Sequence, residues 1–532
     1  MICDTIAYPI AKLANISFET DLHPERLKIE KVIPIFKSGS KMLTSNYRPI
    51  SLLSNLNKII EKIMFTRVHS FLQNENLIYK QQFGFRPKHS TTHALINITE
   101  NIKEALDNGK SACGVFVDLK KAFDTVNHEI LLQKMSRYGI HGPIHKWFKS
   151  YLSNRFQFVS ILGFDSKKQS IKHGVPQGSV LGPLLFLIYI NDLHNAIKHS
   201  KTFLFADDTN LLNININQNK MQREMNIDLR NLCQWLLANK ISLNKTKTEL
   251  IVFKKPSTII PFNKIKINGM KLQPSKSVKY LGIHIDEHLD GSAHTKILIP
   301  KLQRANGMLA KIRHYTSSNQ TKSIYHSIFA SHMTYGCQIW GQSISNAHIN
   351  KIQTLQNNAL RLVTFAANSR DHITPLYAEH NILKIKDLIS LKNILIIHDY
   401  FKEKLPVTFN GFYTLQQNPE KDTPLDLREI IPPSRFNEYD LSDADIRPHL
   451  QDEYRFRNII IEGQLSVPSY NSTKYGRNSL KISSTLCWNN LKKTFPNTDF
   501  LSISREGLKN LVCKLYFDRY KNANVEQIAD LD

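Results

Sequence analysis

Residues 202–212 read TFLFADDTNLL, with two adjacent acids between two apolar runs. This pattern predicts a β-hairpin whose turn carries Asp207 and Asp208. Aspartate tolerates the backbone angles of a turn, so an exposed turn would by itself explain the pair. Adjacent carboxylates also repel each other, and bound cations relieve that repulsion, so a metal site is the alternative. The surrounding sequence has to decide between the two.

A second predicted strand places a third acid at its end. Residues 114–117 read GVFV, a buried-looking run that is followed directly by Asp118. Joining a nucleotide to a primer builds negative charge on the attacking and the leaving oxygen, and two metal ions ~3.5–4 Å apart stabilise both. Mg²⁺ prefers hard oxygen ligands such as carboxylates and phosphates. Asp118, Asp207 and Asp208 therefore suit a site for two Mg²⁺ ions, with Mn²⁺ as the alternative metal.

A loop rich in glycine and proline lies between these two strands. Residues 173–183 read HGVPQGSVLGP and lead into an apolar helix predicted over residues 184–193. Glycines let the backbone approach a ligand closely, and a helix N-terminus offers free N–H groups. Gln177 would then contact a nucleotide or a template base. A plain helix-capping loop is the alternative interpretation.

The chain has 532 residues and a net charge of +25, which favours a polyanionic partner such as nucleic acid or an acidic membrane surface. Its longest strongly apolar run, residues 184–190, is far shorter than the ~20 residues of a spanning helix, so no membrane anchor is expected. The N-terminus also has no secretory pattern, which predicts an intracellular protein.

The stretch between Asp290 and Asp371 contains no acid. Its basic residues are Lys296, Lys301, Arg304, Lys311, Arg313, Lys322, Lys351, Arg361 and Arg370. Apolar residues recur there at helical spacing, at Leu302, Ala305, Met308, Leu309 and Ile312. The pattern predicts helices with a basic face suited to phosphates, although an ordinary solvated face is the alternative.

Five segments resemble, in order, the motifs of reverse transcriptases. Three of them are FVDLKKAFDTVNH at residues 116–128, GVPQGS at residues 174–179 leading to YINDL at residues 189–193, and FADD at residues 205–208. Upstream, NYRPISLL at residues 46–53 and QFGFR at residues 82–86 make the resemblance more specific, to non-LTR retrotransposons and especially the jockey-like group.

The resemblance implies an RNA-directed DNA polymerase that copies an RNA template into DNA by two-metal nucleotidyl transfer. The implied partners are an RNA template, a DNA primer and dNTPs. The implied architecture is an α+β right-hand polymerase with fingers, a palm with an antiparallel sheet and a helical thumb, followed by a mainly helical C-terminal region. The compartment stays open between nucleus and cytoplasm.

Individual roles follow from the same resemblance. Asp118, Asp207, Asp208 and the backbone carbonyl of Leu119 match metal ligands. The positions that match nucleotide-binding residues are Lys37, Arg48, Leu119, Phe123, Gln177 and Gly178. At these positions the cations meet the triphosphate, and Phe123 blocks a ribose 2′-hydroxyl. Within NKTK at residues 244–247, Lys247 would protonate or stabilise the departing pyrophosphate. Tyr280, Leu281 and Gly282 resemble the primer grip, within a strand pattern at residues 278–285.

We expect six segments along the chain. They are a lead-in at residues 1–24, fingers and palm at 25–288, a basic helical thumb at 289–370, a helical extension at 371–402, a linker rich in proline and acids at 403–450, and a small C-terminal unit at 451–532.

Two other hypotheses compete with an active reverse transcriptase. A template-dependent RNA polymerase is disfavoured by the bulky Phe123. A decayed or co-opted element protein that only binds RNA is disfavoured by the three intact aspartates. Related elements usually encode an endonuclease ahead of the polymerase. Because the first matching motif starts near Lys31, we expect target nicking to need an endonuclease from another source.

Overall fold

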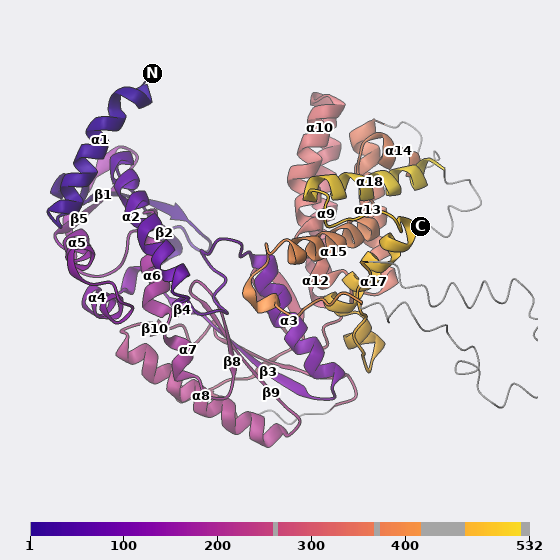
Figure 1. Cartoon of the computed structure of the whole chain (residues 1–532), viewed down its shortest axis with the longest axis horizontal. Helices are drawn as coiled ribbons and strands as arrows, with labels where there is room; N and C mark the ends of the chain where they lie inside the picture. The colour runs from indigo at the N-terminus through magenta and orange to yellow at the C-terminus, as the bar shows by residue number, and fades with distance from the viewer. Residues whose placement is uncertain (1, 259–263, 366–372, 417–462, 523–532) are drawn as a thin grey trace, which may run out of the picture. The chain divides into compact units, whose positions relative to one another are not determined.

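The computed structural model describes residues 2–258, 264–365, 373–416 and 463–522. The chain falls into two compact units, Met1–His294 and Thr295–Asp532 (Figure 1). The first unit combines sheets with helices, and the described part of the second consists mainly of helices. The predicted α+β class with a mainly helical C-terminal region is therefore confirmed.

The first unit contains a five-stranded sheet, named the central sheet below, in the order β14-β11-β3-β9-β8. In that order the strands are Pro274–Ser275, Glu249–Phe253, Ser111–Val117, Asp208–Asn215 and Lys201–Phe205. Apart from the parallel pair of β11 and β14, all neighbouring strands are antiparallel. The middle strand β3 is almost entirely buried, because α3 (Thr91–Asp107) and α8 (Gln218–Ala238) pack on it.

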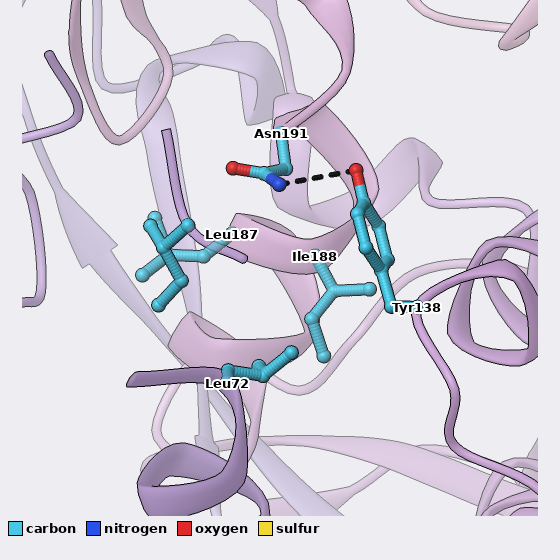
Figure 2. Close-up of a pocket in the computed structure, with 6 residues that line it drawn as sticks. Leu72, Tyr138, Leu187, Ile188 and Asn191 are labelled. Carbon is cyan, nitrogen blue, oxygen red and sulfur yellow. Dashed lines mark hydrogen bonds between the residues drawn. The ribbon is translucent and has the colours of Figure 1, made fainter. Parts of the chain in front are cut away.

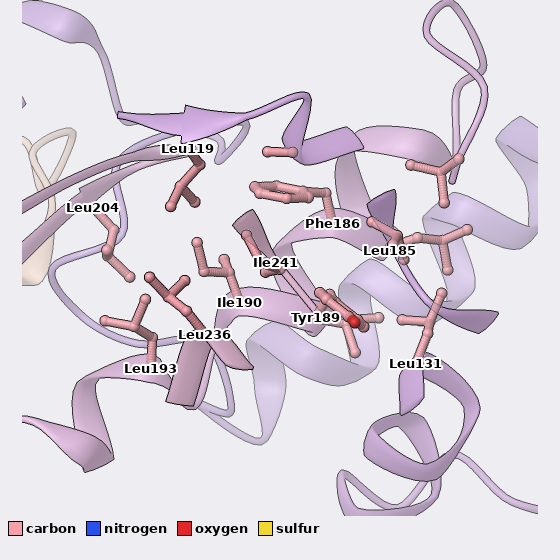
Figure 3. Packing of buried hydrophobic residues seen from close by; sticks show 14 of the residues in the cluster. Leu119, Leu131, Leu185, Phe186, Tyr189, Ile190, Leu193, Leu204, Leu236 and Ile241 are labelled. Atoms are coloured by element: carbon pink, nitrogen blue, oxygen red, sulfur yellow. The ribbon is translucent and has the colours of Figure 1, made fainter. Parts of the chain in front are cut away.

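Helix α6 (Gly182–Ile190) fills the core beside this sheet, and every one of its residues except Pro183 is buried. A helix that is apolar on all sides must lie inside a protein, which explains its position. Figure 3 shows its side chains Leu185, Phe186 and Tyr189 among Leu119, Leu204 and Leu236 of neighbouring elements. The predicted apolar helix is thus confirmed, although it ends at Ile190 instead of continuing to Leu193.

A second sheet, the outer sheet, has the order β2-β1-β5-β6, with β7 also paired to β5. In that order its strands are Tyr47–Leu52, Ile29–Phe36, Arg155–Ile161, Phe164–Asp165 and Gln169–Ile171. A buried ion pair joins its two central strands, with Arg155 Nη2 2.9 Å from Glu30 Oε1. Pairing of this kind is what allows charged side chains to be buried.

The remaining elements of the first unit connect these sheets. The helices are α1 (Ile2–Glu19), α2 (Asn55–Asn74), α4 (His128–Arg137), α5 (Gly142–Leu152) and α7 (Leu193–Ala196). The short strands are β4 (Leu119–Lys120), β10 (Ser242–Leu243), β12 (Lys266–Ile267) and β13 (Met270–Lys271), which form the pairs β4-β10 and β12-β13.

The strand pattern at residues 278–285 forms a hairpin, where a single strand was predicted. Strands β15 (Ser277–Tyr280) and β16 (Ile283–Asp286) pair antiparallel. Leu281 and Gly282 form the turn with positive φ angles of 43° and 85°. Glycine adopts such angles at little cost, so Gly282 permits a reversal that the alternating pattern does not reveal.

The second unit begins with α9 (Ser292–Ile312), which starts just before the boundary between the units. Lys296, Lys301, Arg304 and Lys311 are exposed along α9, whereas Leu302, Ala305 and Leu309 are buried. The predicted basic-faced helix is therefore present. Met308 was expected on the apolar face, but it is 46% exposed.

Further helices complete the described part of this unit. They are α10 (Ser318–Tyr325), a π-helical turn (His326–Ala330), α11 (Ser331–Thr334), α12 (Cys337–Trp340), α13 (Asn346–Thr364), α14 (Thr374–Glu379), α15 (Ile385–Phe401), α17 (Leu480–Thr494) and α18 (Arg505–Lys521). Both α17 and α18 pack on α15, so the C-terminal residues join the helical extension. Most of the linker predicted at residues 403–450, from residue 417 onward, lies outside the described residues.

A small cavity of about 10 Å³ lies beside α6 and is lined by Leu72, Tyr138, Leu187, Ile188 and Asn191 with Ile78 (Figure 2). The Asn191 amide donates to Tyr138 Oη at 3.1 Å and to the Leu77 carbonyl at 2.7 Å. The cavity is too small for a substrate and belongs to the core. Among the described residues, no helix has the length and apolarity needed to cross a membrane.

Candidate active site

The predicted aspartate hairpin is formed by β8 and β9. Phe205 pairs with Asp208, so the turn consists of Ala206 and Asp207 alone. Ala206 has a φ of 54°, in the left-handed region that such two-residue turns require. The hairpin prediction is confirmed, with one difference: Asp208 is the first residue of β9 and so belongs to the strand.

Asp118 directly follows β3, which runs antiparallel to β9. Val117 pairs with Thr209, so the next pair along this ladder brings Asp118 opposite Asp208. Asp118 is also held from another side by Asn244. The Asn244 amide donates to Asp118 Oδ2 at 2.6 Å, and its backbone N–H donates to the Asp118 carbonyl at 2.8 Å. The sheet therefore brings together acids that are 90 residues apart in the sequence.

The three carboxylates interact electrostatically. Burial, together with the charges of Asp207 and Asp118, raises the pKa of Asp208 to about 6. Burial and the charge of Asp118 also raise the pKa of Asp207, while the cations of Lys37 and Arg48 act in the opposite direction. The ionised form of this cluster is thus destabilised by its own charges, and a divalent cation would relieve that repulsion.

The donor set fits magnesium in its chemistry. Carboxylates supply the hard oxygen ligands that Mg²⁺ prefers, and this ion usually keeps only one or two protein carboxylates and takes its other ligands from phosphate and water. Within the described residues, no three His, Cys, Asp or Glu side chains are grouped closely enough to hold a metal ion by themselves, and this includes the three aspartates. The proposed ions would therefore need further oxygen ligands from a substrate or from water. Leu119, in β4, is paired with Leu243 of β10.

Gln177 is fixed on two sides. Its side-chain Nε2 donates to Asp124 Oδ1 at 2.6 Å, and its backbone carbonyl accepts from the Ser51 N–H at 2.8 Å. Gly178 follows with a φ of +130°, and a Cβ there would lie 2.5 Å from the Ser51 carbonyl oxygen. Only glycine allows this contact between the loop and β2. The contact holds the loop in one conformation against β2.

Phe123 is held between two other aromatic rings. Its ring stacks on that of Phe186 with a centroid distance of 4.5 Å and meets the edge of Phe85 at 6.1 Å. Its backbone carbonyl accepts from the Val175 N–H at 2.9 Å, which ties it to the loop containing Gln177. The ring is therefore a fixed steric boundary.

The cationic candidates differ in their positions. Arg48 is exposed on β2 of the outer sheet and Lys37 is exposed directly after β1, and the charges of both act on Asp207. Lys247 is exposed in the turn after Asn244, and it is not among the charges that act on Asp207 or Asp208. The structure thus groups Lys37 and Arg48 with the aspartates and gives no such link for Lys247.

Tyr280 is 3% exposed and packs against Phe116 of β3 with a centroid distance of 5.6 Å. Phe116 lies two residues before Asp118. The hairpin of β15 and β16 is therefore anchored beside the strand that carries the first aspartate. Its turn residue Gly282 is exposed, and Leu281 is partly exposed.

Sequence reasoning missed the residue that braces the aspartate hairpin. Gln82 Oε1 accepts from the Ala206 N–H at 3.0 Å and from the Gly84 N–H at 2.9 Å. Gly84 packs so closely that a Cβ on it would lie 2.3 Å from the Ala206 nitrogen. Gln82 and Gly84 lie in the segment QFGFR at residues 82–86. This segment contributed to the family resemblance, but no structural role was predicted for either residue.

Comparisons with known proteins agree with this geometry. Residues 35–285 match the family model described as "Reverse transcriptase (RNA-dependent DNA polymerase)". The probable RNA-directed DNA polymerase from transposon BS of Drosophila melanogaster is 30% identical over 67% of this chain and 40% of its own length. The RNA-directed DNA polymerase from mobile element jockey of the same species is 31% identical over 67% of this chain and 40% of its own length.

A solved structure, apo telomerase from Candida tropicalis, matches 50% of this chain and 54% of its own at 15% identity with a TM-score of 0.35, too low to compare folds. The chain spans about 40% of the length of the transposon polymerases that it matches. Residues 35–285 of the chain are therefore a reverse transcriptase domain, of the kind found in jockey and related non-LTR elements.

Proposed function

We propose that the chain is the RNA-directed DNA polymerase of a non-LTR retrotransposon, which extends a DNA primer on an RNA template from dNTPs. One observation carries the proposal. Asp118, Asp207 and Asp208 lie at neighbouring strand ends and act on one another's charge within a reverse transcriptase domain. A set of carboxylates placed in this way suits phosphoryl transfer with two metal ions.

In this proposal Asp118, Asp207 and Asp208, with the Leu119 carbonyl, hold two Mg²⁺ ions. When bound, the ions stabilise the charge on the attacking 3′-oxygen and the leaving pyrophosphate. Lys37 and Arg48 donate to the triphosphate and offset its charge, which is supported by their influence on Asp207. Lys247 remains the proposed donor to pyrophosphate, on family resemblance alone.

The other proposed contacts select and align the substrates. The fixed ring of Phe123 excludes a ribose 2′-hydroxyl, and Gln177 with Gly178 meets the incoming nucleotide or its template partner. The hairpin residues Tyr280, Leu281 and Gly282 align the primer end, with the exposed turn facing the DNA and Tyr280 serving as its anchor. The basic face of α9 supports a role in holding the phosphates of the template and primer.

The test is primer extension by the purified chain on an RNA template with dNTPs and Mg²⁺, in parallel with RNA binding. We expect extension by the wild-type protein and none by Asp207→Asn, with RNA binding unchanged. Asp165→Asn is the matched control, because Asp165 is an exposed carboxylate in β6. Wild-type RNA binding with no extension above the Asp207→Asn background would instead support a protein that only binds RNA.

A further inference from the structure

A buried carboxylate on α2 lies outside the aspartate cluster. The residue is Glu61, which is 0% exposed. Its Oε1 accepts from Tyr151 Oη at 2.7 Å and from the Asn57 amide at 2.8 Å. Its Oε2 accepts from the backbone N–H of Val180 at 2.6 Å. One side chain thus joins α2 to α5 and to the loop that precedes α6.

A buried carboxylate needs a reason, because removing it from water is costly unless hydrogen bonds compensate. Burial raises the pKa of Glu61, while hydrogen bonds from Tyr151 and Val180 and the charge of Arg155 act in the opposite direction. The Arg155 guanidinium lies over the Tyr151 ring, 4.7 Å from its centroid. Both oxygens of the carboxylate thus have hydrogen-bond donors, which compensates for the burial of its charge.

The hydrogen bond to Val180 fixes one end of the loop formed by residues 177–180. The other end is fixed at Ser51 of β2, whose N–H donates to the Gln177 carbonyl at 2.8 Å, while Gly178 packs against the Ser51 carbonyl. Gln177 thus lies on a short segment held at both ends. If the end at Val180 is released, the contacts of Gln177 with Ser51 and Asp124 remain, but the segment is no longer held at both ends.

We propose that Glu61 is a positioning residue, whose carboxylate fixes the backbone at Val180 and thereby places Gln177 and Gly178 for the incoming nucleotide. The inference rests on the proposed function, because it assigns Glu61 to the nucleotide pocket of that polymerase. A purely architectural role is the competing explanation, since the same carboxylate also bonds Tyr151 in the core.

Two matched substitutions separate these explanations. Glu61→Gln keeps the shape of the side chain, but an amide offers a single acceptor oxygen and cannot accept from all three donors. Tyr151→Phe removes a hydrogen bond to the same carboxylate from the core and leaves the bond to Val180 in place. Glu61→Met fills the same space without an acceptor and replaces the first variant if that one does not fold.

The measurements are the dNTP KM and kcat in primer extension, the melting temperature, and the hydrogen-exchange rate of the Val180 amide. We expect Glu61→Gln to raise the dNTP KM and the Val180 exchange rate by about tenfold each, because a hydrogen bond to a charged group is lost. Template-primer affinity should not change. Tyr151→Phe should lower the melting temperature by a similar amount to Glu61→Gln. It should leave the dNTP KM and the Val180 exchange rate near those of the wild type.

Two results would overturn the inference. One is a Glu61→Gln protein with wild-type KM and wild-type Val180 exchange. The other is an equal rise of the dNTP KM in Tyr151→Phe and Glu61→Gln at matched melting temperature. The rise would then be caused by a general loss of core stability and not by the bond to Val180. If the wild-type protein extends no primer, the proposed function fails and the nucleotide step of this inference fails with it. The Val180 exchange rate then still decides whether Glu61 anchors the loop.

Discussion

Asp208 is a partly buried aspartate whose charged form is unfavourable in the protein without bound metal. Its pKa is raised to about 6 because it is buried and lies beside two other carboxylates. Such a group is less stable in its charged form than an exposed aspartate. The arrangement is explained if a divalent cation completes it, which is the basis of the proposed polymerase mechanism.

Phe123 provides a prediction at the same scale. Replacing it with alanine should reduce the preference for dTTP over UTP by about a hundredfold, because the stacked ring no longer occupies the space of a 2′-hydroxyl. The measurement is the ratio of kcat/KM for the two nucleotides on an RNA template. Phe164→Ala, at an aromatic residue that is 82% exposed, is the control. An unchanged ratio in Phe123→Ala would remove Phe123 from the selectivity mechanism.

Elements were predictable where the signal is local. The aspartate hairpin follows from a run of eleven residues, and α6 follows from an apolar stretch that only a buried helix explains. The turn at Leu281 and Gly282 was missed, because alternation continues through a two-residue turn. The brace from Gln82 to Ala206 could not be predicted, since it joins positions 124 residues apart by a single hydrogen bond.

Helix α9 provides a prediction at the scale of an element. Replacing Lys301, Arg304 and Lys311 with glutamine should flatten the slope of log affinity against log salt by about two to three, because fewer counterions are released on binding. The measurement is template-primer binding at several salt concentrations. The exposed Lys386, Lys402 and Lys404, changed together in the same way, form the control. An equal slope in the α9 variant and the control would show that this face does not contact phosphates.

At the scale of the whole molecule, the order of the sequence motifs indicated the catalytic domain, and the structure shows how packing brings these motifs together. The strand before Asp118, the loop at Gln177 and the hairpin at Asp207 converge only after β3, α6 and β9 have packed around one core. The network around Glu61 depends on the same long-range packing. No local pattern marks Glu61, which looks like an ordinary charge on a helix surface in the sequence.

The stability of the first unit should depend on pH through His23. Burial, with the charges of Arg155 and Lys28, lowers the pKa of His23 to about 3, whereas an unfolded histidine titrates near ~6.5. Between these values the unfolded state binds the proton, so stability is greatest above pH ~6.5 and falls as the pH decreases. The loss reaches about 2 kcal/mol by pH ~5.

The corresponding measurement is the free energy of unfolding at neutral pH and at pH ~5. His23→Phe should remove this part of the pH dependence, because a phenyl ring fills the site against Trp147 and Tyr151 without a proton to gain. The exposed His141→Phe is the control and should keep the wild-type dependence. Identical pH profiles for wild type and His23→Phe would refute the assignment.

The central claim is that three aspartates form one metal-dependent centre for DNA synthesis on RNA. The most direct measurement is single-turnover incorporation of one dNTP on an RNA template by Asp118→Asn, Asp207→Asn and Asp208→Asn, each compared with Asp165→Asn. Each of the three should lower the rate by about a thousandfold or more, because metal ions contribute several kcal/mol of transition-state stabilisation. A rate within about tenfold of the control in any of the three would contradict the claim.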